Sequence, residues 1–247
     1  MKRWIKALLY PLYEQRLIRS LDLTKTPQHI GVILDGNRRW AKANPTADGD
    51  VSTSRGHRAG ANKIVALLDW CEEVNVKVVT LWLLSNDNLK REAAELNPLL
   101  AIIGETVAEL GKLGRWEVRP MGSLELLPEE LRTKLNSVAA KSKGIEGVIV
   151  NVAIGYGGRK EIVDAVKNVI SESARSGKSA LEIADALSVE DINKNLYTAG
   201  QPDPELVIRT SGEQRLGGFL LWQSAHSEFY FCEAYWPDFR KVDFLRA

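Results

Sequence analysis

The chain contains 247 residues, of which 45% are hydrophobic and 26% charged, and its formal net charge is +1. These values are typical of a folded globular protein, and they exclude a disordered chain and a globally basic nucleic-acid-binding protein. The two cysteines are too few for a disulfide framework or a zinc cluster, and no apolar run is long enough to cross a bilayer. We therefore expect a cytoplasmic protein without a nucleic-acid partner, in which any anion-binding site is local.

Residues 1–24 are expected to form a helical arm in front of one α/β domain at residues 25–247. The arm combines apolar side chains such as Trp4 and Leu8 with lysines and arginines, and Pro11 is expected to break or kink it. This composition fits a helix that packs on the domain or on a partner subunit, which we favour. A basic amphipathic helix in peripheral contact with a membrane surface is the alternative.

Residues 29–42 (HIGVILDGNRRWAK) have the pattern of a strand, a turn and the start of a helix. The apolar run at 30–34 predicts a buried parallel strand, and Asp35-Gly36-Asn37 favour a tight turn. Backbone N–H groups at such a turn can bind an anion, with charge-assisted hydrogen bonds from Arg38 and Arg39. A carboxylate beside a phosphate usually holds a divalent cation. An ordinary turn in which Asp35 caps the helix is the alternative.

Strand and helix patterns then alternate along the rest of the chain. Further strands are predicted at 76–84, 115–121, 147–154, 205–208 and 228–232, and helices at 57–74, 95–113, 129–143, 159–174, 181–196 and 237–246. A polar loop at 43–54 and a glycine-rich turn at 155–159 separate some of them. This alternation predicts a single domain with a central, mostly parallel sheet flanked by helices.

Polar clusters follow several of these strands, so they are expected to meet at one edge of the sheet. The pooled residues are Asp35, Arg38, Arg39, His57, Asn88, Arg91, Arg209, Glu213, Arg215 and Glu228. Converging arginines with a few carboxylates fit a polyanionic ligand and a metal ion. The glycines at 155, 157 and 158 fit either a phosphate cradle or close strand–helix packing. The sequence lacks the P-loop, the G-x-G-x-x-G, H-E-x-x-H and D-D-x-x-D motifs. From the residues alone we predict a metal-assisted enzyme that acts on phosphate or diphosphate.

Five segments carry a more specific signal. HIGVILDGNRRWAK, LLSNDNLKR, NVAIGYGGR and LVIRTSGEQRLGGFLLWQSAHSEFYF with YWPDF together resemble the cis-prenyltransferases, the undecaprenyl diphosphate synthase family. The resemblance extends from about Pro27 to the C-terminus. It implies a homodimeric α/β enzyme with a hydrophobic tunnel, which uses Mg²⁺ to condense isopentenyl diphosphate onto an allylic diphosphate with a cis double bond.

The resemblance also implies roles for single residues. Asp35 would be the catalytic carboxylate that handles Mg²⁺ and the leaving diphosphate, and Glu228 a second metal ligand. Asn88 would be catalytic as well, assisting proton removal. The substrate-binding set would be Gly36, Asn37, Arg38, Arg39, Trp40 and His57 for the allylic diphosphate, Ser85, Asn88 and Arg91 in a positioning loop, and Arg209 and Arg215 for isopentenyl diphosphate. Glu213 would be a structural or dimer-side acid.

The sequence departs from the family pattern at several positions. Leu89 replaces a common tryptophan, Gly217 a common serine, and Thr53 an arginine. The family's C-terminal Arg-x-Gly segment is not among the 247 residues, and a chain without it is expected to bind substrates more weakly.

Leu83 stands where long-chain members often carry alanine, as in the short-chain subgroup that makes Z,E-farnesyl diphosphate from geranyl diphosphate. A bulky wall residue would stop elongation, which we favour; the alternative is that Leu83 is an ordinary core residue. A decaprenyl or undecaprenyl diphosphate synthase remains the rival enzyme. A non-catalytic subunit is disfavoured because such subunits tend to have lost the aspartate and arginines that this chain keeps.

Overall fold

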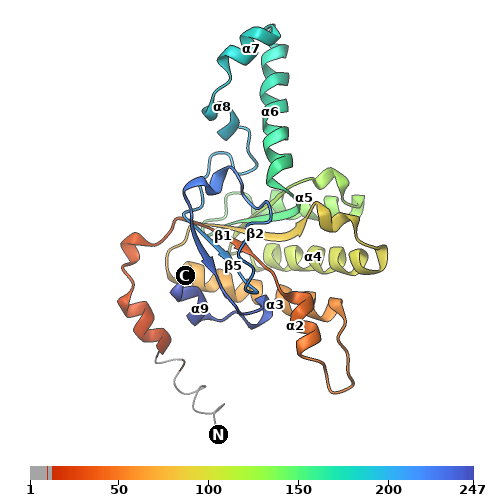
Figure 1. Cartoon of the computed structure of the whole chain (residues 1–247), viewed down its shortest axis with the longest axis vertical. Helices are drawn as coiled ribbons and strands as arrows, with labels where there is room; N and C mark the ends of the chain where they lie inside the picture. The colour runs from red at the N-terminus through yellow and green to blue at the C-terminus, as the bar shows by residue number, and fades with distance from the viewer. Residues whose placement is uncertain (1–9, 11–12) are drawn as a thin grey trace.

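The computed structural model describes residue 10 and residues 13–247, and its centre is a six-stranded parallel sheet (Figure 1). The strands are β1 (His29–Ile33), β2 (Val78–Ser85), β3 (Glu117–Met121), β4 (Ile149–Tyr156), β5 (Leu206–Arg209) and β6 (Glu228–Phe231). Their order is β3-β4-β2-β1-β5-β6, and every adjacent pair is parallel. The predicted single α/β domain with a mostly parallel sheet is confirmed.

Helices connect the strands. They are α2 (Asn37–Ala43), α3 (Thr53–Glu73), α4 (Ala93–Leu113), α5 (Glu129–Ser142), α6 (Gly158–Arg175), α7 (Ala180–Ala186), α8 (Val189–Asn193) and α9 (Lys241–Arg246). Single turns of 3₁₀ helix lie at Leu23–Lys25 (η1), Asp87–Lys90 (η2), Leu124–Leu126 (η3), Gln223–His226 (η4) and Trp236–Asp238 (η5). No helix in the described part of the chain is long and apolar enough to cross a membrane.

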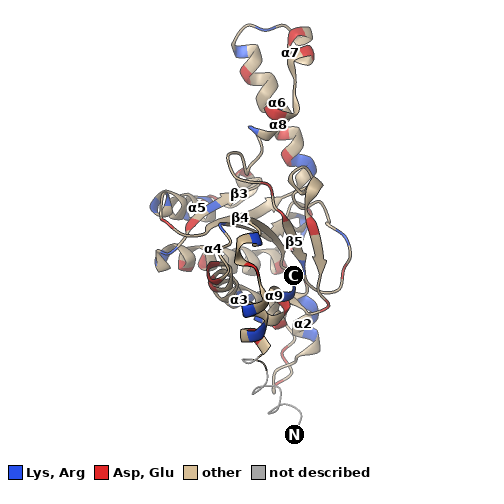
Figure 2. Ribbon diagram, turned by 90° about the vertical axis from the view of Figure 1, so that its left-hand side faces the viewer, with Lys and Arg blue, Asp and Glu red and all other residues tan. Residues whose placement is uncertain are grey.

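The two faces of the sheet are covered differently. One face carries the main core, in which side chains of β1, β2 and β4 pack against α3, α4, α5 and α9. The other face carries a smaller core around Tyr156, Phe219 and Leu220, closed by the irregular segment that follows β5. Beyond it, α6 extends away from the body and α7 lies at its far end, while α8 lies alongside α6, where Ile192 packs with Ala165 (Figures 1 and 2).

Several predicted boundaries need correction. β4 runs to Tyr156, so it contains the first residues of the expected glycine-rich turn. α3 begins at Thr53 rather than at residue 57, which shortens the polar loop. The single helix expected at 181–196 is two short helices, because Ser188 forms a capping box with Asp191 and starts a new helix there.

Only part of the predicted arm can be compared with the structure. The expectations for Trp4, Leu8 and Pro11 lie outside the described residues. Residues 13–20 are helical, and the guanidinium of Arg246 in α9 lies 5.8 Å from the ring centre of Tyr13. This contact supports packing of the arm on the domain, and peripheral membrane contact stays a prediction.

Candidate active site

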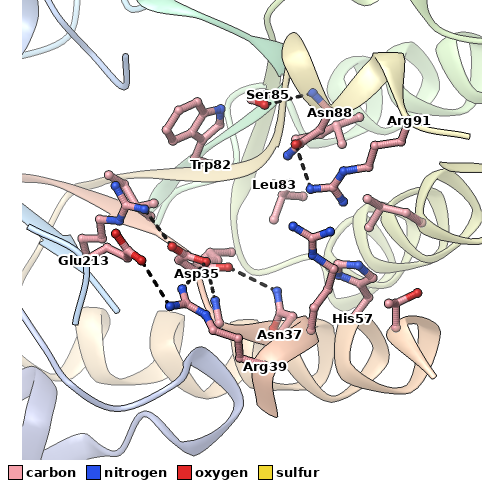
Figure 3. A pocket seen from close by; sticks show the side chains of 18 of the residues that line it. Asp35, Asn37, Arg39, His57, Trp82, Leu83, Ser85, Asn88, Arg91 and Glu213 are labelled. Carbon is pink, nitrogen blue, oxygen red and sulfur yellow. Dashed lines mark hydrogen bonds and ion pairs between the residues drawn. The ribbon is translucent and has the colours of Figure 1, made fainter. Parts of the chain in front are cut away.

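A cleft of about 680 Å³ opens at the carboxyl ends of β1, β2 and β5 (Figure 3). It is lined by Ile33, Leu34, Asp35, Gly36, Asn37, Arg38, Arg39, Lys42, Thr53, His57, Trp82, Leu83, Leu84, Ser85, Asn88, Arg91, Leu99, Arg209, Glu213 and Arg215. The polar clusters that follow three different strands therefore meet as predicted. Figure 2 shows basic residues on α2, the helix that follows β1.

Asp35 lies at the centre of this cleft, two residues after the end of β1. Its Oδ1 accepts a hydrogen bond from the Gly36 N–H at 2.6 Å, and its Oδ2 accepts one from Arg209 Nη2 at 2.8 Å. Arg39 lies 3.2 Å away. Burial would raise the pKa of Asp35, but hydrogen bonds from Arg209 and Ser211 and the charges of Arg209 and Arg39 outweigh it and lower that pKa. Asp35 is therefore an ionised carboxylate surrounded by cations.

The turn after Asp35 depends on Gly36. Its φ is +105°, in the region that favours glycine, and a Cβ there would lie 3.0 Å from the Tyr235 backbone. The turn brings Arg39 back toward Asp35 and Glu213 (Figure 3). Because α2 has only seven residues, we expect the arginine side chains to contribute more to anion binding than the helix itself.

Carboxylates bridge the arginines in two groups. Glu213 lies 3.3 Å from Arg39 and 2.9 Å from Arg215. On the other side of the cleft, Glu95 of α4 lies 3.4 Å from Arg38 and 3.0 Å from Arg91. These acids hold like charges close together before a ligand arrives, which favours binding of a polyanion.

Glu95 was not among the predicted site residues. In the sequence it is the i+4 neighbour of Arg91, a spacing that usually indicates a surface ion pair. Lys42 and Trp82 also line the cleft without having been assigned a role. Among the cleft cations and the described carboxylates, Lys42 is the cation with no acid within ion-pair distance.

His57 is neutral at physiological pH. Burial lowers its pKa to about 4, the charges of Arg91 and Arg38 act in the same direction, and Glu95 opposes them. Its Nε2 is buried and has no hydrogen-bond partner among the described residues, and the same is true of Asn37 Oδ1. Both residues lie where the cleft adjoins a much smaller apolar cavity of about 40 Å³ between β2, α3 and α4.

Leu83 is one of five residues that line both the cleft and this smaller cavity, with Leu34, Asn37, His57 and Leu99. The direction of the Leu83 side chain depends on an irregularity in the sheet. Trp82 pairs with Ala153 and Leu84 pairs with Ile154, so Leu83 is an extra residue on β2. Such bulges re-aim side chains and are common beside active sites. Leu83 therefore lies at a position where its size can limit the apolar space.

Two predicted site residues do not line the cleft. Trp40 points away from it, donating a hydrogen bond to Asp238 at 2.8 Å. Glu228 opens β6 and pairs with Leu206, the first residue of β5, whereas Arg209 lies at the other end of that strand. Three residues of parallel strand span about 10 Å, so Glu228 faces the opposite edge of the sheet. Within one chain it cannot share a metal ion with Asp35.

The glycine-rich turn after β4 also stays outside the cleft. A Cβ on Gly158 would lie 2.8 Å from the Gly218 carbonyl oxygen, and one on Gly157 would lie 3.2 Å from Asn86 Nδ2. These glycines permit close packing of β4 and α6 against neighbouring segments, the second of the two predicted alternatives.

Asp35 fits a magnesium site that the substrate helps to form. The described residues contain no group of three or more His, Cys, Asp or Glu side chains arranged to hold a metal ion. Mg²⁺ is typically bound by one or two carboxylates, with phosphate oxygens and waters as the other ligands. An ionised Asp35 among the arginines of the cleft provides one such carboxylate.

The chain is similar to proteins that make prenyl diphosphates. A family model described as putative undecaprenyl diphosphate synthase matches residues 33–247. A (2Z,6E)-farnesyl diphosphate synthase of Thermobifida fusca is 58% identical over 239 residues, covering 97% of this chain and 92% of that protein. The enzyme of the same description from Mycobacterium tuberculosis is 50% identical over 246 residues, covering 98% and 92%. The crystal structure of lavandulyl diphosphate synthase from Lavandula x intermedia in complex with dimethylallyl diphosphate matches with a TM-score of 0.81 at 30% identity, covering 90% of this chain and 93% of that one.

Proposed function

The chain belongs to the undecaprenyl diphosphate synthase family of prenyltransferases, and we propose that it condenses isopentenyl diphosphate with geranyl diphosphate to give Z-farnesyl diphosphate. The observation that carries this proposal is a cleft of arginines around an ionised Asp35, adjoining a small apolar cavity behind Leu83. The relatives named (2Z,6E)-farnesyl diphosphate synthase support a short product.

Two groups of cations in the cleft suit two diphosphates. Arg38, Arg39 and Arg91 would hold the allylic diphosphate together with Asn37, while Arg209 and Arg215 would hold isopentenyl diphosphate. Arg209 is 7% exposed and donates to the Arg215 carbonyl oxygen as well as to Asp35, so its guanidinium is fixed. The two ligands would then meet above Asp35.

The reaction places negative charge on the leaving group. The electron pair of the isopentenyl double bond forms a bond from C4 to the allylic C1, and the C1–O bond breaks with its electrons going to diphosphate. Arginines fixed in advance stabilise that charge more strongly than solvent would. Bound Mg²⁺, held by Asp35 and substrate phosphates, would supply further charge neutralisation. His57, being neutral, would contribute a hydrogen bond rather than a charge.

Asn88 and Arg91 would orient the substrates for proton removal. Arg91 Nη2 donates to Asn88 Oδ1 at 2.8 Å, and the Asn88 N–H donates to Ser85 Oγ at 3.1 Å. This chain of contacts fixes the loop between β2 and α4 at the mouth of the cleft (Figure 3). Removal of the C2 proton beside a fixed group would set the geometry of the new double bond.

Product analysis tests this proposal. Purified enzyme is supplied with labelled isopentenyl diphosphate, Mg²⁺ and one of dimethylallyl, geranyl or farnesyl diphosphate, and products are dephosphorylated and separated by length. We expect a farnesyl-length product from geranyl diphosphate. In Leu83→Ala the wall is removed, so longer products are expected, while Leu83→Met keeps the volume and serves as the control.

Other outcomes would separate the alternatives. A ladder of long products from the wild type would exclude the short-chain assignment and leave the prenyltransferase assignment intact. An inactive chain that gains activity only with a second protein would indicate a non-catalytic subunit. Equal product length in Leu83→Ala and wild type would assign Leu83 to the core alone.

We also propose that the enzyme is a homodimer formed through β6. In the described part of the chain β6 is paired only with β5, so its other edge is free. Phe229 on this strand is 41% exposed and stacks on Phe231 with ring centres 6.4 Å apart. An aromatic free edge is a pairing surface unless it is covered.

A further inference from the structure

Trp82 lies on the side of β2 opposite to Leu83, and both line the cleft. Its indole stacks on Phe219, with ring centres 5.2 Å apart and planes 11° from parallel, and meets Tyr156 edge-on at 6.3 Å. Tyr156 is fixed in turn, because its hydroxyl donates to Glu161 at 2.5 Å and accepts from the Leu220 N–H at 3.1 Å. The orientation of the indole is therefore set by packing, and Figure 3 looks onto its ring from the cleft.

The indole N–H of Trp82 has no partner among the described residues, although it is buried. The two fully buried tryptophans differ in this respect: Trp116 donates to Glu72 at 2.6 Å and Trp236 to the Gly60 carbonyl at 2.8 Å. A buried donor without an acceptor is costly, and a phenylalanine or leucine would avoid that cost. We therefore look for the role of this tryptophan in its aromatic ring and not in its N–H group.

The ring lies close to Arg209, one of the two arginines that would hold isopentenyl diphosphate. A Cβ on Gly217 would lie 3.5 Å from Cη2 and Cζ3 of Trp82 and 3.8 Å from Arg209 Nη1. The indole ring and the Arg209 guanidinium therefore both lie beside Gly217. In isopentenyl diphosphate, C3 is three single bonds from the bridging oxygen, about 4 Å. A molecule held by Arg209 and Arg215 would therefore place C3 close to this indole, an inference that rests on the proposed function.

We propose that the indole of Trp82 stabilises the carbocation that forms at C3 during condensation. When the C3=C4 electron pair bonds to the allylic C1 and diphosphate leaves with the C1–O electrons, C3 becomes a tertiary cation. The C2–H electrons then form the new double bond, and the proton passes to a phosphate oxygen of the released diphosphate. Aromatic faces attract cations, and indole does so most strongly. Apart from His57, Trp82 is the aromatic side chain among the cleft-lining residues.

Site-specific replacement of Trp82 by progressively fluorinated tryptophans tests this role, because fluorine removes electron density from the ring with little change in its size. We expect the single-turnover rate to fall in step with fluorination, by about tenfold over the series, with little change in the KM for isopentenyl diphosphate. The same series at Trp222, whose N–H donates to Asn193 at 2.7 Å outside the cleft, is the control and should be flat.

A binding measurement makes the test independent of turnover. An analogue of isopentenyl diphosphate with an ammonium nitrogen at C3 mimics the cation. Its affinity in the presence of inorganic diphosphate should fall along the Trp82 series, while that of isopentenyl diphosphate should stay within about twofold. Equal affinities of the analogue across the Trp82 series, or an unchanged turnover rate in an active enzyme, would refute the proposed role of Trp82. Either result would leave the proposed function intact. An inactive wild type that still shows the affinity trend would refute the proposed function and not the cation site.

Discussion

At the scale of single residues, the charge of Asp35 is determined by its neighbours more than by its burial. Its pKa is lowered although desolvation acts to raise it, because Arg209, Ser211 and Arg39 favour the ionised form. The carboxylate therefore stays charged when the pH falls below its ordinary pKa of 3.8. A group that balances several arginines, and that we propose to hold Mg²⁺, needs this property.

Asp35→Asn keeps the shape of the side chain and removes its charge. We expect kcat to fall by about 10² to 10³. The variant loses the carboxylate that positions the arginines around the leaving diphosphate and that would hold Mg²⁺. Steady-state kinetics with a circular dichroism check of folding measures this. Asp69→Asn, at an exposed pair with Arg115, is the matched control. A loss of less than about threefold in Asp35→Asn would show that Asp35 only anchors Arg209.

At the scale of elements, the sequence predicted the site where polar residues directly follow a strand. Asp35 after β1, Asn88 after β2 and Arg209 at the end of β5 all meet in the cleft. Glu228 does not follow a strand but is the first residue of β6, and the strand predicted at 228–232 already began with it. Its inclusion among the pooled polar residues was therefore wrong by position, and its metal role came from the family pattern.

Other features of the site depend on tertiary geometry. The bulge that aims Leu83 arises from the register between β2 and β4, which alternation of residue types does not reveal. Glu95 reaches the cleft only because α4 packs beside it. Trp82 lies within an apolar strand sequence, where an aromatic residue is ordinarily interpreted as core.

A buried polar network crosses three strands and depends on a neutral His29. Its Nδ1 donates to the Pro202 carbonyl oxygen at 2.7 Å, and its Nε2 accepts from the Thr80 hydroxyl at 2.8 Å. Thr80 Oγ1 in turn accepts from Asn151 Nδ2 at 2.9 Å. Burial lowers the pKa of His29 to about 4, while the Pro202 carbonyl and Glu205 act to raise it. The folded protein therefore disfavours the protonated ring.

This network predicts a loss of stability in mild acid. Between pH 6.5 and about 4 the unfolded chain binds a proton at His29 that the folded chain does not, so the free energy of unfolding falls as the pH falls. The expected loss is on the order of 3 kcal/mol, and His57 adds in the same direction. Urea unfolding at several pH values should show a shallower pH dependence in His29→Gln. The exposed His226, changed to Gln, should leave the slope unaltered. Equal slopes in all three proteins would contradict the role of His29.

At the scale of the whole molecule, the two free edges of the sheet differ in how they are protected. β3 carries Pro120, and Arg119 and Glu117 form an ion pair at 2.7 Å along it, both of which discourage pairing with another chain. β6 has the sequence EFYF, without proline and with Phe229 half-exposed. If the molecule associates with a second copy of itself through a sheet edge, β6 is the edge that permits it.

The homodimer proposal can therefore be tested at one side chain. Sedimentation equilibrium of the wild type should give twice the chain mass of 27.5 kDa. Phe229→Asp places a charge at the proposed contact, where burying it unpaired is costly, so we expect dissociation at least about tenfold more readily than in the wild type. Leu126→Asp changes a side chain that is 59% exposed in the turn after β3, and it should leave the mass unchanged. A wild type that sediments as a monomer would refute the homodimer. A Phe229→Asp variant that stays as tightly dimeric as Leu126→Asp would place the subunit contact elsewhere. Because Glu228 is the neighbour of Phe229 on this strand, the same experiment tests whether that carboxylate lies at an interface between two chains and not on a free surface.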